Sequence, residues 1–170
     1  MSRLIFITGG ARSGKSRYAQ ELGLQHSGNP LYVATARVWD EDFRERVDRH
    51  RGERDERWTT IEEEKYLSRL PLAGRTAVID CITLWITNFF SDSGYDPKAS
   101  FAACREEIDL LLAHDAFLIV VSNEIGMGLH AETEAGRQFT DLQGRVNQYL
   151  AARADEVILM ISGIPLTVKK

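Results

Sequence analysis

The segment that most constrains the fold occupies residues 9–16, directly after a short apolar run at residues 4–8. It reads Gly9-Gly10-Ala11-Arg12-Ser13-Gly14-Lys15-Ser16 and fits the pattern G-x-x-x-x-G-K-[ST]. Residues 15–26, which follow, have the apolar spacing of a helix. A strand, a glycine-rich turn and a helix in this order are the setting in which the pattern forms a phosphate-binding loop.

The residue types of this loop suit the binding of phosphate groups. Glycines let backbone N–H groups wrap around phosphate oxygens, and the start of a helix adds a favourable dipole. Lys15 would reach the outer phosphates, and the Ser16 hydroxyl can ligate Mg²⁺. The alternative is a chance glycine-rich turn, but the register of Lys15 and Ser16 favours phosphate binding.

Apolar runs bounded by turn residues recur along the chain. They cover residues 4–8, 31–34, 76–80, 117–122 and 157–161. Because they are continuous rather than alternating, they are typical of strands buried on both faces of a parallel sheet. Helical spacing occurs between them, at residues 15–26, 41–51, 100–113 and 137–152. This alternation predicts an α/β doubly wound sheet.

We expect residues 1–170 to form one domain, because no repeat or linker divides them. The last residues, 165–170, could add a short edge strand.

The net charge is -4 and no continuous basic surface is evident, so we do not expect nucleic acid as a partner. Cys81 and Cys104 lack metal or redox spacing and should be reduced core residues. With no signal peptide or transmembrane segment evident, we expect a cytoplasmic protein.

A phosphate-bound Mg²⁺ needs an acidic group at the tip of a neighbouring strand. Asp80 ends the apolar run at residues 76–80, and Glu124 follows the run at residues 117–122. Either could instead be a helix N-cap or a loop acid. For Glu124 we consider the cap or loop interpretation and the metal role equally supported. For Asp80 we favour a metal or nucleotide role.

All of the net charge comes from residues 40–65, which hold eleven acidic and seven basic residues while the rest of the chain balances. Within this segment, Phe43, Val47 and His50 have the spacing of one helical face. Six arginines lie within fourteen residues, at Arg44, Arg46, Arg49, Arg51, Arg54 and Arg57. Arginine pairs with phosphate oxygens, and a neutral imidazole nearby can accept a phosphoryl or nucleotidyl group.

Two other interpretations of this segment stay open at this point. His50 could simply border the core, as a lone histidine often does. The arginines could also be paired with acids on a solvated helix, since Glu45 and Arg49, and likewise Glu53 and Arg57, are four residues apart.

Seven strings of residues carry a resemblance to one family. They are Gly9 to Ser16, Tyr32-Val33-Ala34-Thr35-Ala36, Arg46-Val47-Asp48-Arg49-His50-Arg51 with Trp58, Asp80-Cys81-Ile82-Thr83, Ser122-Asn123-Glu124-Ile125-Gly126-Met127-Gly128, Gly144-Arg145-Val146-Asn147-Gln148 and Ile161-Ser162-Gly163. Together they resemble the bifunctional adenosylcobinamide kinase / adenosylcobinamide-phosphate guanylyltransferase family of cobalamin biosynthesis. The likeness runs almost from end to end of the chain. The fifth and sixth strings make it specific, because the loop alone would identify only the superfamily.

The resemblance implies a P-loop NTPase fold of the RecA-like kind, with a mostly parallel sheet flanked by helices, and a homotrimer. It implies two transferase reactions. A nucleoside triphosphate, ATP or GTP, phosphorylates adenosylcobinamide, and GTP then acts as nucleotidyl donor to give adenosylcobinamide-GDP and pyrophosphate. In the family a histidine carries the GMP, and the residue at that position here is His50.

The resemblance also implies the residues of the site, with Lys15 and His50 as the catalytic pair. The nucleotide-binding residues would be Gly9, Gly10, Ala11, Arg12, Ser13, Gly14, Lys15, Ser16, Ala34, Thr35, Ala36, Arg51, Gly52, Glu53, Arg54, Glu62 and Asp80. Ser16 and Asp80 would hold Mg²⁺. This chain has Arg49 where several relatives carry a second histidine, which leaves His50 as the only histidine of the segment. Asp80 stands where Glu also occurs, and its shorter side chain leaves open whether it meets the metal directly or through water.

Two other functions are compatible with the loop alone. One is a small-molecule kinase with a single activity, in which His50 is structural. The other is a regulatory nucleotide-binding protein that transfers nothing to a small molecule, against which the lack of linkers or docking tails speaks weakly.

Overall fold

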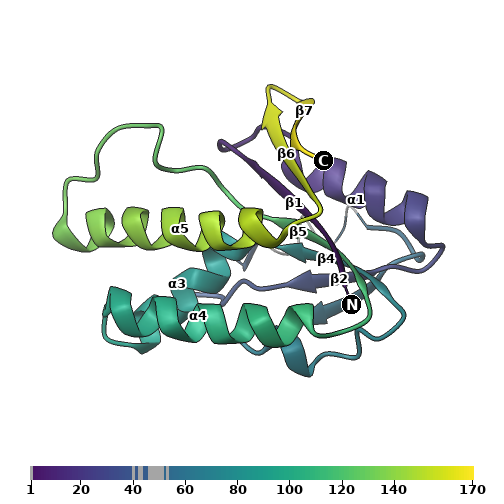
Figure 1. Cartoon of the computed structure of the whole chain (residues 1–170), viewed down its shortest axis with the longest axis horizontal. Helices are drawn as coiled ribbons and strands as arrows, with labels where there is room; N and C mark the ends of the chain where they lie inside the picture. Colours follow the sequence, from purple (N-terminus) through teal and green to yellow (C-terminus); the bar gives the residue numbers. More distant parts are fainter. Residues whose placement is uncertain (1, 40, 42–43, 46–51, 53) are drawn as a thin grey trace.

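The computed structural model describes residues 2–39, 41, 44–45, 52 and 54–170 of the chain. Within this part, seven strands form one sheet with helices on both faces (Figure 1). The strands are β1 (Arg3–Gly9), β2 (Leu31–Ala34), β3 (Thr59–Glu62), β4 (Thr76–Asp80), β5 (Phe117–Val121), β6 (Glu156–Ile161) and β7 (Ile164–Lys169). The helices are α1 (Lys15–His26), α3 (Ile82–Asp92), α4 (Pro97–Leu112) and α5 (Glu134–Arg153), with a short 3-10 helix η1 (Leu67–Arg69).

The order of the strands decides which loops meet. It is β3-β2-β4-β5-β1-β6-β7, and neighbouring strands are parallel except for β6 and β7. β5 therefore lies between β1 and β4, and the carboxyl ends of these three strands form the middle of one edge of the sheet. At the usual strand spacing the ends of β1 and β4 are about 10 Å apart. The predicted α/β fold, a mostly parallel P-loop sheet flanked by helices, is confirmed.

Each face of the sheet has its own core, because alternate residues of a strand point to opposite faces. Leu4 and Phe6 of β1 pack on the side covered by α3, α4 and α5, where Trp85 is completely buried. Ile5 and Ile7 pack on the other side with Ala19 of α1. Burial on both faces explains why the strands read as continuous apolar runs.

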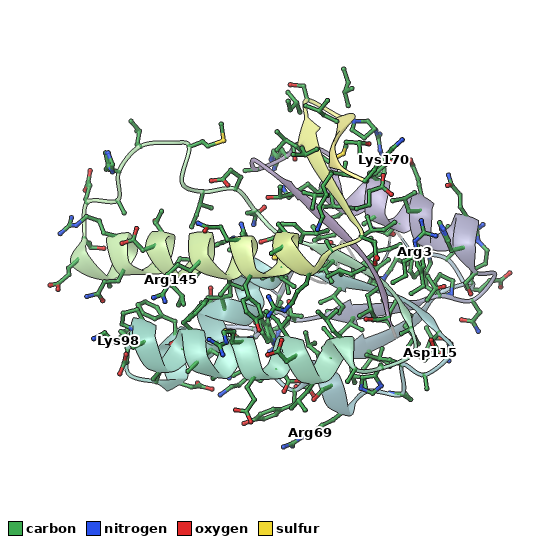
Figure 2. The ribbon with its side chains drawn as sticks, viewed as in Figure 1. Arg3, Arg69, Lys98, Asp115, Arg145 and Lys170 are labelled. Carbon is green, nitrogen blue, oxygen red and sulfur yellow. The ribbon has the colours of Figure 1, made fainter. Side chains whose placement is uncertain are left out.

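Charged side chains lie on the outside of these layers, and Arg69, Lys98 and Lys170 stand at the outer edge of the molecule (Figure 2). Arg145 of α5 lies over the ring of Phe101 of α4, with its guanidinium carbon 4.1 Å from the ring centroid. This cation–π contact adds to the apolar contacts that join the two helices.

The sequence predicts the bounds of α1, β2 and β4 correctly. Helix α4 begins earlier than residue 100, at Pro97, because the carboxylate of Asp96 accepts hydrogen bonds from the next free backbone amides and proline suits the first helical position. Helix α5 likewise begins at Glu134 rather than at residue 137, and Thr133 caps it by accepting a bond from the Gly136 amide.

Two elements are not indicated by the sequence pattern. Helix α3 begins at Ile82, only one residue after β4 ends, so no turn residues separate strand from helix. Strand β3 has four residues and lies at the edge of the sheet. The expected C-terminal edge strand is present as β7, paired antiparallel to β6. The helix expected at residues 41–51 falls mostly outside the described residues.

A close approach between α1 and Trp58 gives a test of this packing. A Cβ atom at Gly23 would lie 2.9 Å from the Trp58 ring and 3.1 Å from Val78 Cγ2. Alanine in a helix ordinarily stabilises by about 1 kcal/mol relative to glycine. We expect Gly23→Ala to lower the free energy of unfolding instead, by about 1–3 kcal/mol, because the site is already filled. Urea unfolding measures this.

The matched control is Gly144→Ala in α5, where nothing lies within 4 Å of the added Cβ. This variant should be more stable than the wild type by roughly 0.5–1 kcal/mol. Equal effects of the two substitutions would contradict the packing described for Gly23.

Candidate active site

The loop between β1 and α1 has a backbone shape that glycine makes possible. Gly9 has φ 151° and Gly14 has φ 90°, both in the region that disfavours other residues. A Cβ atom at Gly9 would also lie 2.6 Å from the carbonyl oxygen of Met160 in β6. The turn between β6 and β7 braces the far side of the loop, because the Gly163 amide donates to the Ser13 carbonyl at 2.9 Å.

Lys15 is held inside this loop. Its side chain is 7% exposed, and Nζ donates to the Gly10 carbonyl at 2.5 Å and lies 3.4 Å from Ser13 Oγ. Burial lowers the pKa of Lys15, and the negative charge of Asp80 acts in the opposite direction. The amine is therefore already positioned where a phosphate bound by the loop amides would meet it.

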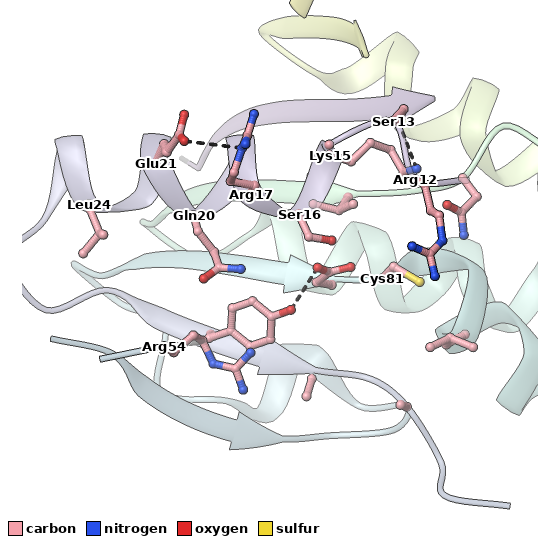
Figure 3. A pocket seen from close by; sticks show the side chains of 18 residues that line it. Arg12, Ser13, Lys15, Ser16, Arg17, Gln20, Glu21, Leu24, Arg54 and Cys81 are labelled. Carbon is pink, nitrogen blue, oxygen red and sulfur yellow. Dashed lines mark hydrogen bonds and ion pairs between the residues drawn. The ribbon is translucent and has the colours of Figure 1, made fainter. Parts of the chain in front are cut away.

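The loop opens onto a cleft of about 850 Å³. Figure 3 shows Ser16 and Gln20 of α1 on one wall and Arg54 on the opposite wall. The lining residues are Arg12, Ser13, Gly14, Lys15, Ser16, Arg17, Gln20, Glu21, Leu24, Tyr32, Ala34, Ala36, Arg54, Asp80, Cys81, Leu84, Val121 and Asn123. The cleft thus runs from the phosphate-binding loop along α1 and across the ends of β2, β4 and β5.

Three side chains that line the cleft contact one another in a row: Asp80, Tyr32 and Arg54. The Tyr32 hydroxyl donates to Asp80 Oδ2 at 2.9 Å. Burial and the neighbouring Asp80 raise the pKa of Tyr32 well above its usual range, so the phenol stays a donor. The guanidinium carbon of Arg54 lies 3.8 Å from the centroid of the Tyr32 ring, and Trp58 meets the same ring edge-on. Tyr32 therefore orients both a carboxylate and a cation that face the cleft.

Thr35 has a different place from its neighbours in the sequence. Its side chain is fully buried, donates to the Cys81 carbonyl at 2.7 Å and accepts from the Cys81 amide at 2.9 Å. Asn88 of α3 donates to the Thr35 carbonyl at 2.9 Å. Ala34 and Ala36 line the cleft, whereas Thr35 ties their loop to the residue that follows Asp80. The peptide bond between Asp80 and Cys81 is cis.

Both cysteines are buried and unpaired, as expected from the sequence. Burial raises the pKa of the Cys81 thiol to about 12, and that of Cys104 to about 12 as well. Neither is therefore a thiolate near neutral pH, although Cys81 touches the cleft.

The two acidic candidates at the strand ends have separate environments. Asp80 lines the cleft. Glu124 lies outside the set of lining residues, and its Oε1 accepts a hydrogen bond from the Gly126 amide at 2.6 Å. Its own amide donates to the Gly9 carbonyl at 2.9 Å, which fastens the end of β5 to the loop. The geometry favours Asp80 as the carboxylate available to a ligand.

Four charged residues brace the chain where it leaves β2. Arg37 donates to Glu64 at 2.6 Å and to Asp92 at 2.7 Å, and Lys65 donates to Asp92 at 3.0 Å. The bonds from Arg37 and Lys65 hold the pKa of Asp92 well below its usual range. This cluster joins the segments after β2 and β3 to the end of α3.

The charged segment at residues 40–65 is described in part. Exposed pairs join Arg57 to Asp55 and Arg44 to Glu41. The two expected i,i+4 pairs include Arg49 and Glu53, which lie outside the described residues. Some arginines of the segment are thus paired with acids, while Arg54 lies in the cleft.

The structure brings together many of the site residues expected from the sequence. Those that line the cleft are Arg12, Ser13, Gly14, Lys15, Ser16, Ala34, Ala36, Arg54 and Asp80. Gly9, Gly10 and Ala11 belong to the loop without lining the cleft, and Glu62 and Gly52 are exposed. His50, Arg51 and Glu53 lie outside the described residues.

Several cleft residues were not anticipated, among them Gln20, Leu24, Tyr32 and Asn123. Asn123 could have been found, because it follows an apolar run and the carboxyl ends of parallel strands gather at one edge of a sheet. Tyr32 lay within a string of the resemblance, but its contact with Asp80 depends on the pairing of β2 with β4.

The described part of the chain has neither a membrane-spanning helix nor a cluster of metal-binding side chains. It contains no helix long and apolar enough to cross a membrane. It also contains no group of three or more His, Cys, Asp or Glu side chains placed to hold a metal ion.

The sequence matches a family model described as "Cobinamide kinase / cobinamide phosphate guanyltransferase" over residues 5–168. The chain belongs to this family. The bifunctional adenosylcobalamin biosynthesis protein CobU of Escherichia coli K12 is 39% identical over 181 residues, covering 98% of the chain and 99% of that protein. The CobU protein of Salmonella typhimurium LT2 gives the same identity and coverage.

The bifunctional adenosylcobalamin biosynthesis protein CobP of Pseudomonas aeruginosa PAO1 is 34% identical over 167 residues, with 96% of the chain and 95% of that protein covered. Among solved structures, the flagellar accessory protein FlaH of Methanocaldococcus jannaschii aligns with a TM-score of 0.48 at 15% identity, covering 98% of the chain and 78% of FlaH. The resemblance to the cobinamide kinase / guanyltransferase family that the sequence motifs indicate is thereby confirmed.

Proposed function

We propose that the chain carries out two successive transfers in cobalamin biosynthesis. It phosphorylates adenosylcobinamide with a nucleoside triphosphate, ATP or GTP, and then transfers GMP from GTP to that phosphate. The observation that carries the proposal is the buried Lys15 amine in a glycine-rich loop that faces Asp80 across the cleft, in a chain of this family.

In the kinase step the chain's contribution is positioning and charge stabilisation. The loop amides and the α1 N-terminus bind the phosphates, and Lys15 Nζ leaves the Gly10 carbonyl for a phosphate oxygen. The acceptor hydroxyl then attacks the terminal phosphorus and loses its proton to solvent, the bond to the bridging oxygen breaks, and the nucleoside diphosphate leaves.

The oxygen donors at the start of α1 and the end of β4 fit Mg²⁺. Ser16 offers a hydroxyl and Asp80 a carboxylate, both at the cleft, and Mg²⁺ commonly uses one or two protein ligands together with phosphate oxygens and water. When bound, Mg²⁺ would neutralise charge on the phosphates. Tyr32 orients the Asp80 carboxylate toward this place by its hydrogen bond.

For the second reaction we propose His50 as the group that carries GMP. A nitrogen of the neutral imidazole attacks the α-phosphorus of GTP, the bond to the bridging oxygen breaks, and pyrophosphate leaves. The phosphate of the corrinoid substrate then attacks the same phosphorus, the P–N bond breaks, and the imidazole is regenerated. Position 50 is four residues before Arg54, and four extended residues span at most about 14 Å. Arg54 lines the cleft.

The residues that we propose to contact the nucleotide are those that the family resemblance implies. Outside the phosphate-binding loop, the contact of the Arg54 guanidinium with the Tyr32 ring gives the strongest structural support for one of them. Within the described residues one phosphate-binding loop is present, and we propose that both transfers use it.

We further propose a single domain that acts in the cytoplasm as a homotrimer. An exposed edge strand that carries Ile164, Leu166 and Val168 supports self-association.

Incubation with GTP and Mg²⁺ tests the guanylyl half directly. We expect the intact mass to rise by one GMP and peptide mapping to place the adduct at His50, with pyrophosphate released in equal amount. Adding phosphorylated cobinamide should discharge the adduct, because the P–N bond is the intermediate.

The His50→Ala protein is the control, and it should accept no GMP while still phosphorylating cobinamide. An adduct on that variant, or no adduct on the wild type, would rule out the proposed intermediate. Phosphoryl transfer without pyrophosphate release from the wild type would leave a kinase with a single activity.

The link between Tyr32 and Asp80 gives a second prediction. Tyr32→Phe keeps the ring under Arg54 but removes the donor to Asp80. We expect the Mg²⁺ dissociation constant of the nucleotide complex to rise roughly tenfold, as happens when a partner of a metal-binding carboxylate is removed. Titration of Mn²⁺ followed by electron paramagnetic resonance measures this without turnover.

Tyr95→Phe is the matched control, since Tyr95 is exposed on the turn between α3 and α4. It should bind the metal as the wild type does. Equal metal affinity in the Tyr32→Phe protein would remove Asp80 from the metal site.

A further inference from the structure

Asn123 lies at the centre of the carboxyl edge of the sheet. Val121 at the end of β5 pairs with Ile7 of β1 on one side and with Asp80 of β4 on the other. Three residues later the chain passes Gly9, where the amide of Glu124 donates to the Gly9 carbonyl. Asn123 therefore stands between the phosphate-binding loop and Asp80, and it lines the cleft.

The backbone of Asn123 is fixed by three side chains from two helices, α3 and α5. Its amide donates to Thr83 Oγ1 of α3 at 3.1 Å. Its carbonyl accepts from Gln143 Nε2 at 2.7 Å and from Asn147 Nδ2 at 3.2 Å, both on α5. Gln143 is 1% exposed, and a carbonyl can only accept, so the amide nitrogen of Gln143 must face Asn123.

Further bonds close this network. Gln143 Nε2 also lies 2.6 Å from Thr83 Oγ1, and Ser122 Oγ donates to Asn147 Oδ1 at 2.7 Å. Among the described residues, Gln143 Oε1 is buried without a hydrogen-bond partner, whereas its Nε2 and the side chains of Thr83, Ser122 and Asn147 are paired. Burying polar groups is unfavourable unless they are paired, so these hydrogen bonds favour one conformation. Here the selected conformation is that of the backbone of one cleft residue.

The side-chain amide of Asn123 is left out of the network. It has no hydrogen-bond partner among the described residues, although its backbone amide and carbonyl are both paired. A fixed backbone with an unpaired polar side chain in a cleft leaves that side chain available to a ligand. The groups closest in the fold are those that bind the outer phosphates, at the Lys15 loop, and the Asp80 carboxylate.

We propose that the Asn123 side chain donates a hydrogen bond to an oxygen of the terminal phosphate of the bound nucleoside triphosphate. Asn123 is then the residue by which the cleft distinguishes a triphosphate from a diphosphate, and Gln143 is a positioning residue that holds it. This inference rests on the proposed binding of a nucleoside triphosphate in the cleft.

The test compares the affinities for the β,γ-imido analogue of GTP and for GDP by isothermal titration calorimetry with Mg²⁺. The background is the His50→Ala protein, so that no guanylylated protein accumulates. A hydrogen bond to a charged phosphate is worth roughly tenfold or more in affinity. Asn123→Ala should lower the ratio of triphosphate to diphosphate affinity by that factor, while the affinity for GDP stays within about threefold.

Asn123→Asp separates a donor from a merely structural residue, because it keeps the shape and replaces the NH₂ donor with a negative charge. It should lower the ratio further than Asn123→Ala does. Gln143→Met, which keeps Asn123 but removes a donor to its carbonyl, should lower the ratio by a smaller factor. Asn29→Ala, which removes an exposed amide in the turn before β2, should leave it unchanged.

An unchanged ratio in both Asn123 variants would overturn the inference, even where the parent protein binds the triphosphate. An Asn123→Asp ratio equal to that of the parent would contradict the donor role, and a Gln143→Met ratio equal to it would remove the positioning role of Gln143. If the parent bound neither nucleotide, the inference and the proposed function would fail together. If the wild type bound both and transferred nothing to cobinamide, only the proposed function would fail.

Discussion

The placement of one ammonium group inside a glycine-rich loop is the interaction on which the site depends. Lys15 begins α1, and its Nζ is turned back onto the Gly10 carbonyl of the same loop. This shape needs the positive φ angles of Gly9 and Gly14. It also needs a rigid base, which β1 provides because it is paired on both sides, with β5 and with β6. The first turn of the fold therefore prepares a place for phosphate before any ligand is bound.

The order of the strands then decides which groups meet that phosphate. With β5 between β1 and β4, the residues after β5 and at the end of β4 come to the edge where the loop lies. Asp80 and Asn123 are held there by different means. A phenol from the neighbouring strand orients the carboxylate of Asp80, and polar side chains of α3 and α5 fix the backbone of Asn123. Both helices also bury the apolar face of the sheet, so the core and the site share the same elements.

The sequence predicts those parts of the molecule that depend on local pattern. The loop, α1 and the strand that ends at Asp80 follow from spacing and residue type, and the family follows from short strings spread over the chain. Helix α3 is not predicted from the sequence, because no turn residue separates it from β4. Thr35 illustrates a second limit. Its neighbours line the cleft, yet its own hydroxyl bonds to the Cys81 backbone, which only the pairing of β2 with β4 brings near. The contacts of Tyr32 with Asp80 and Arg54 are long-range in the same way. The role of His50 is supported by the arginines around it in the sequence and by the resemblance, because His50 lies outside the described residues.

The most direct test of the account is to remove the charge of Lys15 and to follow both transfers in one protein. Lys15→Met keeps an extended side chain without the amine. The account predicts that phosphorylation of cobinamide and guanylylation of His50 both fall by roughly a hundredfold or more, since one loop serves both. A Lys15→Met protein that still accepts GMP from GTP at the wild-type rate would contradict it, because the second transfer would then require a nucleotide site elsewhere.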